Sequence, residues 1–404
     1  MKKFLLTALA FCTAIAAAAQ TPAATEPEGY RFTDVRLIPM TPVKDQHRSG
    51  TCWCYSTLSF LEGEILRAGG RPVHLSEMWI VRHTFMDKAV KYVRMHGEIN
   101  FAEGGASHDV TEGIKNHGIV PQEAYPGFNY GTEKADFHEL SLVLKAYLDA
   151  VITASGKSSD KALSTAWKRG FDAILDEYFG RMPETFTYEG KEYTPRSFAA
   201  SLPIDMDDYI DITSFTHHPF YTQFIIEIPD NWMWGTVYNL PLDEMMQTVD
   251  YALNNGYTVC WDGDVSEKGF SFTNGVAINP EVKKVENLSN TDRARFEKLG
   301  EKERLEEVFK FERPYPEINV TPEVRQAGFE SFVTTDDHLM HLTGIAKDQN
   351  GTKYYITKNS WGTDRNKFGG YLNMSESFVR AKTIYVMVHK DAIPKAIKGK
   401  LGIR

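Results

Sequence analysis

The sequence predicts an α+β protein in which helices and strands occupy different parts of the chain. Three stretches carry apolar residues at helical spacing: 52–65, 140–151 and 163–178. From about residue 209 the pattern changes to short runs of β-branched and aromatic residues, such as 224–228. A chain of 404 residues can also bury a large core. We therefore expect helices early in the chain and a sheet that begins after them, with a further amphipathic helix at 242–253.

The first of these helices is expected to begin at Cys52. Its apolar residues recur at spacings of four, three and four: Cys54, Leu58, Leu61 and Ile65. Gly69 and Gly70 mark its end. A helix N-terminus offers free N–H groups and favours negative charge, so it favours the thiolate form of a cysteine placed there. Cys54 should face about 200° away from Cys52, toward the core.

Residues 1–19 have the composition of an export signal. Met1-Lys2-Lys3 is a short basic start, residues 4–18 are apolar and small, and residues 17–19 are alanines that suit a signal peptidase. The apolar run is too short for a comfortable membrane span, and it lacks the amphipathic pattern of the alternative, an N-terminal core helix. We expect export to the periplasm or the medium of a bacterial cell, followed by a flexible leader at 20–29.

Composition and charge argue against two classes of protein, those that bind nucleic acids and those held together by disulfides. The formal net charge of −9 is not that of a nucleic-acid-binding protein. Removal of the signal would leave three cysteines, an odd and small number that argues against a disulfide framework, although one pair could still form. We expect Cys54 and Cys260 to be buried, inert thiols.

Cofactor signals are weak. The pair His217-His218 resembles metal ligands, but no third ligand follows at a useful spacing, and no His-Glu-x-x-His motif occurs. No glycine-rich phosphate loop stands between a strand and a helix. We therefore expect neither a metal nor another cofactor.

Four residues supply the parts that a thiol nucleophile needs: the thiol, a base, a group that holds the base, and a donor for the oxyanion. Gln46 stands six residues before Cys52, and Trp53 follows the cysteine directly. Much later come Asp337-His338 and then 358–362, which reads Lys-Asn-Ser-Trp-Gly.

This order, with these neighbours, resembles the papain-like cysteine peptidases. The resemblance implies a papain-like fold, in which a helical domain meets an antiparallel, barrel-like β-domain. It implies that Cys52 is the nucleophile and His338 the base, and that Asn359 accepts a hydrogen bond from the far ring nitrogen. Gln46 and the backbone N–H of Cys52 would then stabilise the oxyanion. An imidazolium beside the thiolate should lower the thiol pKa. Ser49 stands where papain-type enzymes carry a cysteine.

Three further positions follow from this resemblance. Trp361 is expected to cover the histidine–asparagine bond and to border the substrate. Gly104 and Gly105 lie where family members bind the substrate backbone, although a simple turn is the alternative. His341 competes with His338 as the base, but it should point to the opposite face of the same strand.

Within the family, the chain resembles the bleomycin hydrolase and aminopeptidase C branch over residues 30–390, most closely in 334–338, which reads Thr-Thr-Asp-Asp-His. This branch carries a helical insertion, and 286 residues separate Cys52 from His338 (338 − 52), roughly twice the distance in papain. We place the insertion at about 130–210 within a peptidase domain at 30–394. The resemblance also implies a homo-oligomer, specifically a hexamer that encloses a chamber.

The leading interpretation is a cysteine-type aminopeptidase that acts on peptides. In the resembling branch the C-terminal segment blocks the cleft, so we expect the tail at 395–404, with Leu401 to Ile403, to lie in it. The alternatives are an endopeptidase with an open cleft, an acyl-transfer enzyme that uses the same pair of residues, and an idle peptide-binding scaffold. The four intact site residues argue against the last.

Overall fold

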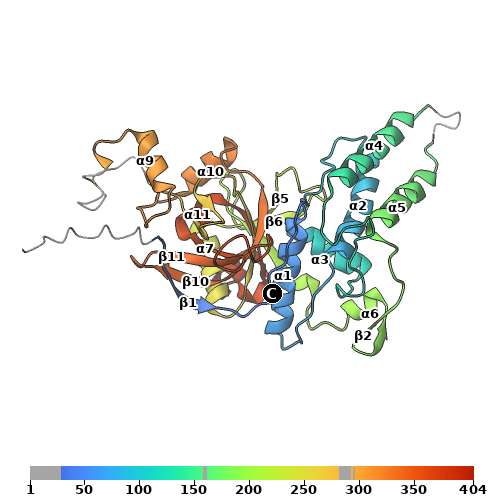
Figure 1. Cartoon of the computed structure of the whole chain (residues 1–404), viewed down its shortest axis with the longest axis horizontal. Coiled ribbons are helices and arrows are strands. Elements are labelled where there is room, and N and C mark those ends of the chain that lie inside the picture. The colour runs from blue at the N-terminus through green and yellow to red at the C-terminus, as the bar shows by residue number, and fades with distance from the viewer. Residues whose placement is uncertain (1–28, 158–161, 282–292, 294–295) are drawn as a thin grey trace, which may run out of the picture.

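The computed structural model describes residues 29–157, 162–281, 293 and 296–404. The expected signal at 1–19 and nearly all of the leader lie outside these residues. The described chain forms two parts with the long helix α1 (Cys52–Arg67) between them, as Figure 1 shows. Helices gather on one side of α1 and a large sheet on the other. The predicted α+β organisation is confirmed.

The helical part contains α2 (Glu77–Arg94), α3 (Ser107–His117), α4 (His138–Ala154) and α5 (Ala166–Phe179). It is followed by a hairpin of β2 (Phe186–Tyr188) and β3 (Lys191–Tyr193), by α6 (Pro195–Ala199), and by a short 3-10 helix, η1 (Met206–Asp208). The helices predicted at 52–65, 140–151 and 163–178 are therefore present as α1, α4 and α5. Their apolar faces are buried in one cluster that includes Leu58, Leu144 and Phe171.

Within the described residues one 11-stranded sheet forms the second part, in the order β5-β6-β4-β13-β7-β10-β11-β12-β9-β8, with β1 paired to β10. The strands are β1 (Phe32–Leu37), β4 (Tyr209–Thr213), β5 (Gln223–Ile225), β6 (Thr236–Asn239), β7 (Val259–Gly263), β8 (Phe270–Ser271), β9 (Val276–Ala277), β10 (His338–Asp348), β11 (Lys353–Lys358), β12 (Tyr371–Ser375) and β13 (Thr383–His389). Most neighbours are antiparallel.

The remaining helices pack around this sheet. They are α7 (Leu242–Asn254), α9 (Glu301–Val308), α10 (Pro322–Glu330), α11 (Glu376–Lys382), α12 (Lys395–Leu401) and the 3-10 helix η3 (Lys390–Ala392). The helix expected at 242–253 is thus α7, and its buried face joins a second apolar cluster with Trp261 and Leu342 of the sheet. None of the helices in the described ranges is both long and apolar enough to cross a membrane.

Helix α1 is buried along most of its length because it packs against β10 and β7 on one side and α2 and α3 on the other. Even its acidic residues are inside, and each has a cationic partner. Glu62 lies 3.2 Å from the Lys44 ammonium, and Glu64 lies 2.7 Å from the Arg67 guanidinium. A buried charge without a partner would destabilise this interface strongly.

The segment interpreted as an insertion consists mainly of α4, α5 and the β2–β3 hairpin. It is attached to α2 by an ion pair, in which the buried Arg82 lies 2.8 Å from the half-exposed Asp172. Tyr92 of α2 also donates to Asp149 of α4 at 2.7 Å. Helices α4 and α5 lie side by side and project beyond the rest of the helical part (Figure 1).

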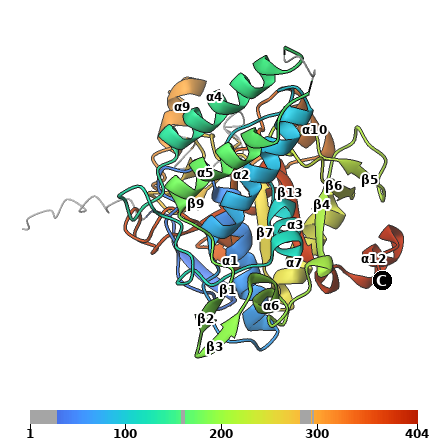
Figure 2. The same ribbon diagram turned by 90° about the vertical axis from the view of Figure 1, so that its right-hand side faces the viewer.

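The C-terminal tail does not lie where the sequence resemblance places it. Residues 395–401 form α12, and Ile397 and Leu401 are buried with residues of α7 in the second cluster. Lys400 lies 2.5 Å from Glu244, which is also on α7. Figure 2 shows α12 at the edge of the molecule, beyond α7. The expectation that the tail fills the cleft is therefore wrong for this structure, because Ile397 and Leu401 pack against α7.

The burial of the tail gives a stability prediction. Leu401→Ala should lower the free energy of unfolding by about 2 kcal/mol, because it leaves a cavity against α7. Lys395→Ala, at an exposed position of the same helix, is the matched control and should change it by less than about 0.5 kcal/mol. Denaturant unfolding measures both. Equal values for the two variants would contradict the packing described here.

Candidate active site

The candidate nucleophile, Cys52, is the first residue of α1 and is 9% exposed. The backbone N–H of Leu339 contacts its sulfur and favours the thiolate. The partial positive charge of the helix N-terminus also favours the thiolate. Leu339 directly follows the candidate base in the chain, so this contact places the start of β10 against the start of α1.

The candidate base, His338, is the first residue of β10 and is buried. Its Nε2 lies 2.8 Å from Oδ1 of Asn359, which directly follows β11. Because that oxygen can only accept, Nε2 carries the proton, and Nδ1 is the nitrogen that can take a proton from a thiol. Strands β10 and β11 are antiparallel neighbours, so their pairing joins two residues that are distant in sequence.

The asparagine is itself held in place. Its Oδ1 also accepts the Ser360 N–H at 2.7 Å, and its own N–H donates to the Gly370 carbonyl at 3.1 Å. Its side-chain nitrogen is buried and has no hydrogen-bond partner in the described part of the chain. The orientation of the amide therefore depends on Oδ1, which makes the two contacts.

Trp361 covers this pair. Its ring stacks on the His338 ring with 4.7 Å between centroids and 30° between planes. The rings of Phe270 and Phe272 contact the indole with their planes nearly perpendicular to it. This stacking is the arrangement expected of a residue that shields the histidine, and contact of Trp361 with a substrate stays a prediction.

Gln46 lies next to the same turn. Its Oε1 accepts the Ser360 hydroxyl at 2.6 Å, and its backbone N–H donates to the Ser360 carbonyl at 2.8 Å. One hydrogen of its side-chain amide goes to the Ser49 carbonyl at 2.7 Å. The second amide hydrogen remains for an oxyanion. Ser360 therefore links Gln46 to the asparagine, a role that the sequence analysis did not assign to it.

The competing histidine is excluded by its position. His341 Nδ1 lies 3.0 Å from the Ser59 hydroxyl on α1, and the ring is 1% exposed. Burial, with a smaller effect from the Lys358 charge, lowers the pKa of His341 well below its usual value. It faces the middle of α1 and not its start, as the alternation along a strand predicts.

Burial acts against ionisation of both reacting groups. It raises the pKa of the Cys52 thiol to about 12 and lowers the pKa of the His338 imidazole to about 4. Transfer of the proton from sulfur to Nδ1 creates both charges together, and their attraction in a buried site offsets the loss of hydration. The thiolate expected from the sequence therefore forms together with the His338 imidazolium, and a lowered pKa belongs to these two groups jointly and not to the thiol alone.

The glycine loop lies against the nucleophile. The Trp53 indole donates to the Glu103 carbonyl at 2.9 Å, and the Gly50 N–H donates to the Glu103 carboxylate at 2.5 Å. The Lys88 ammonium also holds the loop, because it donates to the Gly104 carbonyl at 2.5 Å. A side chain on Gly105 would meet the Trp53 ring at 3.0 Å. The loop is thus a bound edge beside Cys52 and not a free turn.

Three acidic residues near the thiol were not assigned a role from the sequence. Asp230, Asp262 and Asp336 each raise the pKa of Cys52 by their charge. Asp336 could have been found from its place two residues before His338. The other two come from distant segments, and only the folded chain brings them here.

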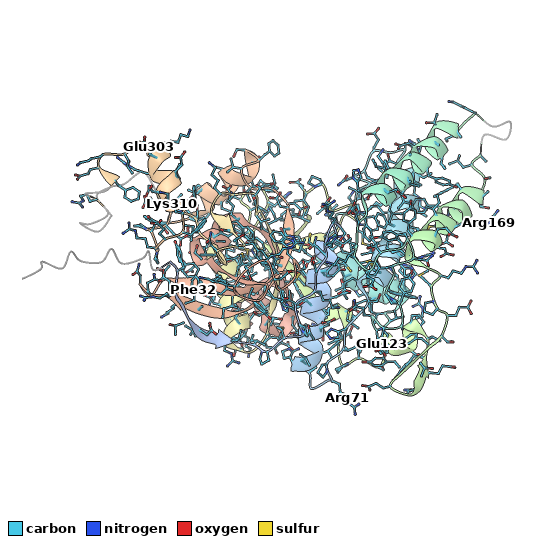
Figure 3. All side chains as sticks on the ribbon, in the orientation of Figure 1. Phe32, Arg71, Glu123, Arg169, Glu303 and Lys310 are labelled. Carbon is cyan, nitrogen blue, oxygen red and sulfur yellow. The ribbon has the colours of Figure 1, made fainter. Side chains whose placement is uncertain are left out.

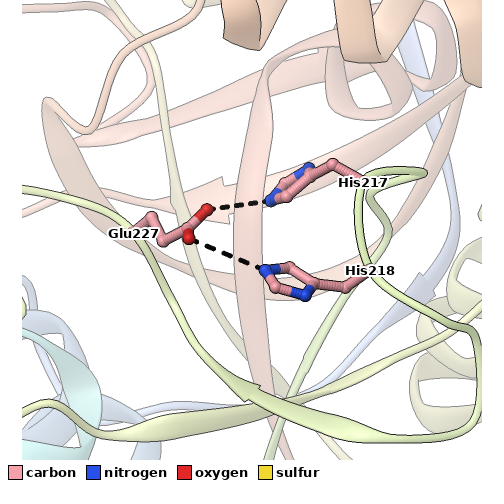
Figure 4. Close-up of side chains that lie close together, drawn as sticks. All are labelled: His217, His218 and Glu227. Atoms are coloured by element: carbon pink, nitrogen blue, oxygen red, sulfur yellow. Dashed lines mark hydrogen bonds and ion pairs between the residues drawn. The ribbon is translucent and has the colours of Figure 1, made fainter.

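The two adjacent histidines do acquire a third neighbour, which the sequence analysis missed. Figure 4 shows Glu227 facing His217 Nε2 at 3.0 Å and His218 Nε2 at 3.7 Å. The amide group of Gln326 donates to His217 Nδ1 at 2.9 Å, while its oxygen accepts the Thr216 N–H. Nδ1 is then an acceptor, so Nε2 carries the proton and has no lone pair for a metal. The cluster is a hydrogen-bonded loop contact.

Comparison with known proteins agrees with this site. The chain matches the "Papain family cysteine protease" model over residues 30–168 and the "Peptidase C1-like family" model over residues 307–402. Aminopeptidase G of Lactobacillus delbrueckii subsp. lactis is 23% identical over 396 residues, which are 89% of this chain and 83% of that protein. Aminopeptidase C of Lactobacillus helveticus is 22% identical over 398 residues, 88% of this chain and 80% of that protein.

A solved structure has the same fold. PepW from Lactobacillus rhamnosis HN001 superposes with a TM-score of 0.67 at 17% identity, over 92% of this chain and 84% of that chain. The first family match contains Cys52, and the second contains His338 and Asn359. The chain is thus similar to papain-family cysteine peptidases around both halves of the candidate site, and to aminopeptidases C and G over most of its length.

Proposed function

We propose that the protein is a cysteine-type aminopeptidase that releases N-terminal residues from peptides through a thioester. One observation carries the chemistry: the thiol at the start of α1 meets the start of β10, where His338 is held by Asn359. The relatives named aminopeptidases, which match over most of this chain, support the exopeptidase part of the proposal.

The first half of the reaction forms the acyl-enzyme. The Cys52 sulfur attacks the scissile carbonyl carbon as its proton passes to Nδ1 of His338. The carbonyl electron pair moves to oxygen, where the Gln46 amide and the backbone N–H of Cys52 stabilise the negative charge. Collapse of this intermediate breaks the C–N bond, and the leaving amine takes the proton from His338.

The second half of the reaction hydrolyses the thioester, and His338 acts again as the base. Water gives a proton to His338 as its oxygen attacks the thioester carbon, and the same donors stabilise the second oxyanion. Collapse then breaks the C–S bond, releases the amino acid and restores the thiol. Throughout, Asn359 keeps the ring in the tautomer that leaves Nδ1 facing the chemistry. We assign Gly104 and Gly105 to the edge that holds the substrate backbone.

The location of the protein in the cell is a further proposal. We infer export to the periplasm or the medium from the signal-like residues 1–19, and N-terminal sequencing of the mature protein tests it.

We also propose a homo-oligomer, hexameric by family resemblance, which is consistent with the exposed apolar residues Leu142 and Val143 on α4. Light scattering of the purified protein tests the assembly.

The nucleophile assignment predicts a difference between neighbouring cysteines. Cys52→Ala should lower kcat at least about 10⁴-fold, because the atom that forms the thioester is lost. Cys54→Ala is the matched control: its thiol is buried and donates to the Glu77 carbonyl at 3.4 Å, so it should lose some stability and keep its turnover. The assignment is wrong if turnover survives in the first variant and is lost in a folded second variant.

The pair of reacting groups predicts a pH effect. Iodoacetamide should alkylate Cys52 at mildly acidic pH, since the ion pair supplies a thiolate there. In His338→Ala no base takes the proton, and burial of the thiol opposes its ionisation, so the alkylation profile should move to alkaline pH. His341→Ala should leave the profile in place. The reverse pattern would make His341 the base.

The exopeptidase proposal predicts dependence on a free amino terminus. One peptide, prepared with a free and with an N-acetylated terminus, should be shortened stepwise in the first form and left intact in the second. Mass spectrometry of timed digests measures this. Internal cleavage of both forms at similar rates would favour the open-cleft endopeptidase.

A further inference from the structure

A small cavity lies between helix α1 and strands β10 and β11, next to the residues that hold the base. Residues that line it include Ser59 and Glu62 of α1, His341 of β10, and Lys358 and Asn359 at the end of β11. About 10 Å³ of the cavity is open to the centre of a water molecule, which is close to the space that one water needs. The size of the cavity therefore suits water.

Three of these residues each have a buried polar atom without a hydrogen-bond partner in the described part of the chain. The atoms are Oε2 of Glu62, Nε2 of His341 and Nδ2 of Asn359. None of the three residues is more than 3% exposed. Oε2 of Glu62 lies 3.9 Å from the His74 ring, which is too far for a hydrogen bond. Since buried polar atoms normally have a partner, three such atoms around one cavity indicate a small polar ligand.

The contacts of His341 show that its free ring nitrogen is a donor. The Lys358 ammonium donates to the Ser59 hydroxyl at 2.8 Å, and that hydroxyl lies 3.0 Å from His341 Nδ1. An ammonium group can only donate, so the hydrogen of the hydroxyl is left for Nδ1. Burial lowers the pKa of His341 well below its usual value, which keeps the ring neutral with its single proton on Nε2.

Water matches the groups around the cavity better than an ion does. His341 and Asn359 offer N–H donors and Glu62 offers an acceptor, and a buried water typically makes about three hydrogen bonds of both kinds. A metal cation would meet these donors and the ammonium groups of Lys44 and Lys358, which also line the cavity. An anion would meet the carboxylate of Glu62.

The unpartnered Nδ2 belongs to the residue that orients the base. Oδ1 of Asn359 accepts from His338 Nε2 at 2.8 Å and from the Ser360 N–H at 2.7 Å. Water bonded to Nδ2 would hold the other end of the amide and favour the orientation in which Oδ1 faces His338. A dry cavity would leave Nδ2 buried without a partner, which destabilises that orientation.

His341 is close to this asparagine because of strand pairing. It lies opposite Lys358 across β10 and β11, and Lys358 directly precedes Asn359. We propose that ordered water occupies the cavity and bonds to Asn359 Nδ2, and that His341 binds this water and so acts as a positioning residue for Asn359 and His338. This inference rests on the proposed roles of those two residues and is independent of exopeptidase specificity. It gives a role to the histidine that is not the base.

Three substitutions at His341 separate an effect through water from an effect of the packing of its ring. His341→Phe keeps a ring, removes both polar atoms and extends into the cavity, so it should exclude water. His341→Gln keeps a donor. His341→Ala enlarges the cavity, and because the walls are polar, additional water should enter and reach Asn359. The matched control is His138→Phe, at an exposed position of α4.

The measurements are kcat and KM on a peptide that the wild type cleaves, with thermal unfolding as the test of folding. His341→Phe should lower kcat about 10-fold and change KM little, because a misoriented base weakens the chemical step and not substrate binding. Its profile of Cys52 alkylation by iodoacetamide should also move toward alkaline pH, since the His338 imidazolium is held less well. The His138 variant should match the wild type.

The other two variants should behave differently. His341→Gln and His341→Ala should keep kcat within about threefold of the wild type, because water still reaches Asn359. The alanine variant should nevertheless unfold at a lower temperature, because it removes buried contacts. A role of His341 in packing alone predicts the opposite order for catalysis, with alanine more harmful than phenylalanine.

A crystal structure of the wild-type protein at high resolution tests the water directly and requires no variant to fold. It should show a water oxygen within about 3.2 Å of Asn359 Nδ2. The same position should hold no water in the His341→Phe variant.

Three results would overturn the proposal. A wild-type crystal structure without water at Asn359 Nδ2 would reject the site itself. An alanine variant that loses as much turnover as the phenylalanine variant would mean that His341 acts through its own contacts. A folded phenylalanine variant with wild-type kcat and alkylation would mean that the water does not position the base. The proposed function fails separately, if Cys52→Ala retains turnover.

Discussion

The burial of α1 between the two parts of the molecule is the constraint on which the site depends. The helix is enclosed by the sheet and by α2 and α3, so the place of its first residue, Cys52, is fixed by packing on both sides. The arrangement requires charge compensation, which Lys44 and Arg67 provide for Glu62 and Glu64. A helix held this firmly presents the same free N–H groups and the same sulfur to every substrate.

The sheet supplies the other half of the site through strand pairing. His338 begins β10 and Asn359 follows β11, and the antiparallel pairing of these strands creates the 2.8 Å bond between them. Ser360 connects the asparagine to Gln46, so the base and the oxyanion donor share one turn. Trp361 stacks over the pair and limits access of water to it. Positions that are separated by hundreds of residues are therefore joined by one continuous set of contacts.

The glycine loop beside Cys52 has a different origin. The glycine loop is held by Trp53, Gly50 and Lys88, while Asp230 arrives from the segment between β5 and β6. Family resemblance places the C-terminal tail in this region, but here the tail forms α12 on α7 (Figure 2). Cys52 is at the N-terminal end of α1, and Arg71, labelled at the bottom of Figure 3, comes shortly after the C-terminal end of this helix. The carboxyl group beside the glycine loop thus comes from the body of the chain and not from its terminus.

The sequence by itself determined the helix that starts at Cys52 and the opposite orientation of His341, because local spacing fixes which face of a helix or strand a side chain occupies. The roles expected of Gln46, His338 and Asn359 came from the resemblance of their motifs to those of papain-like peptidases. Only the tertiary structure decided where the tail packs, that Glu227 reaches two histidines, and that three aspartates meet beside the thiol. Those contacts join segments through strand order and core packing, and local spacing carries no information about which distant segment becomes the neighbour.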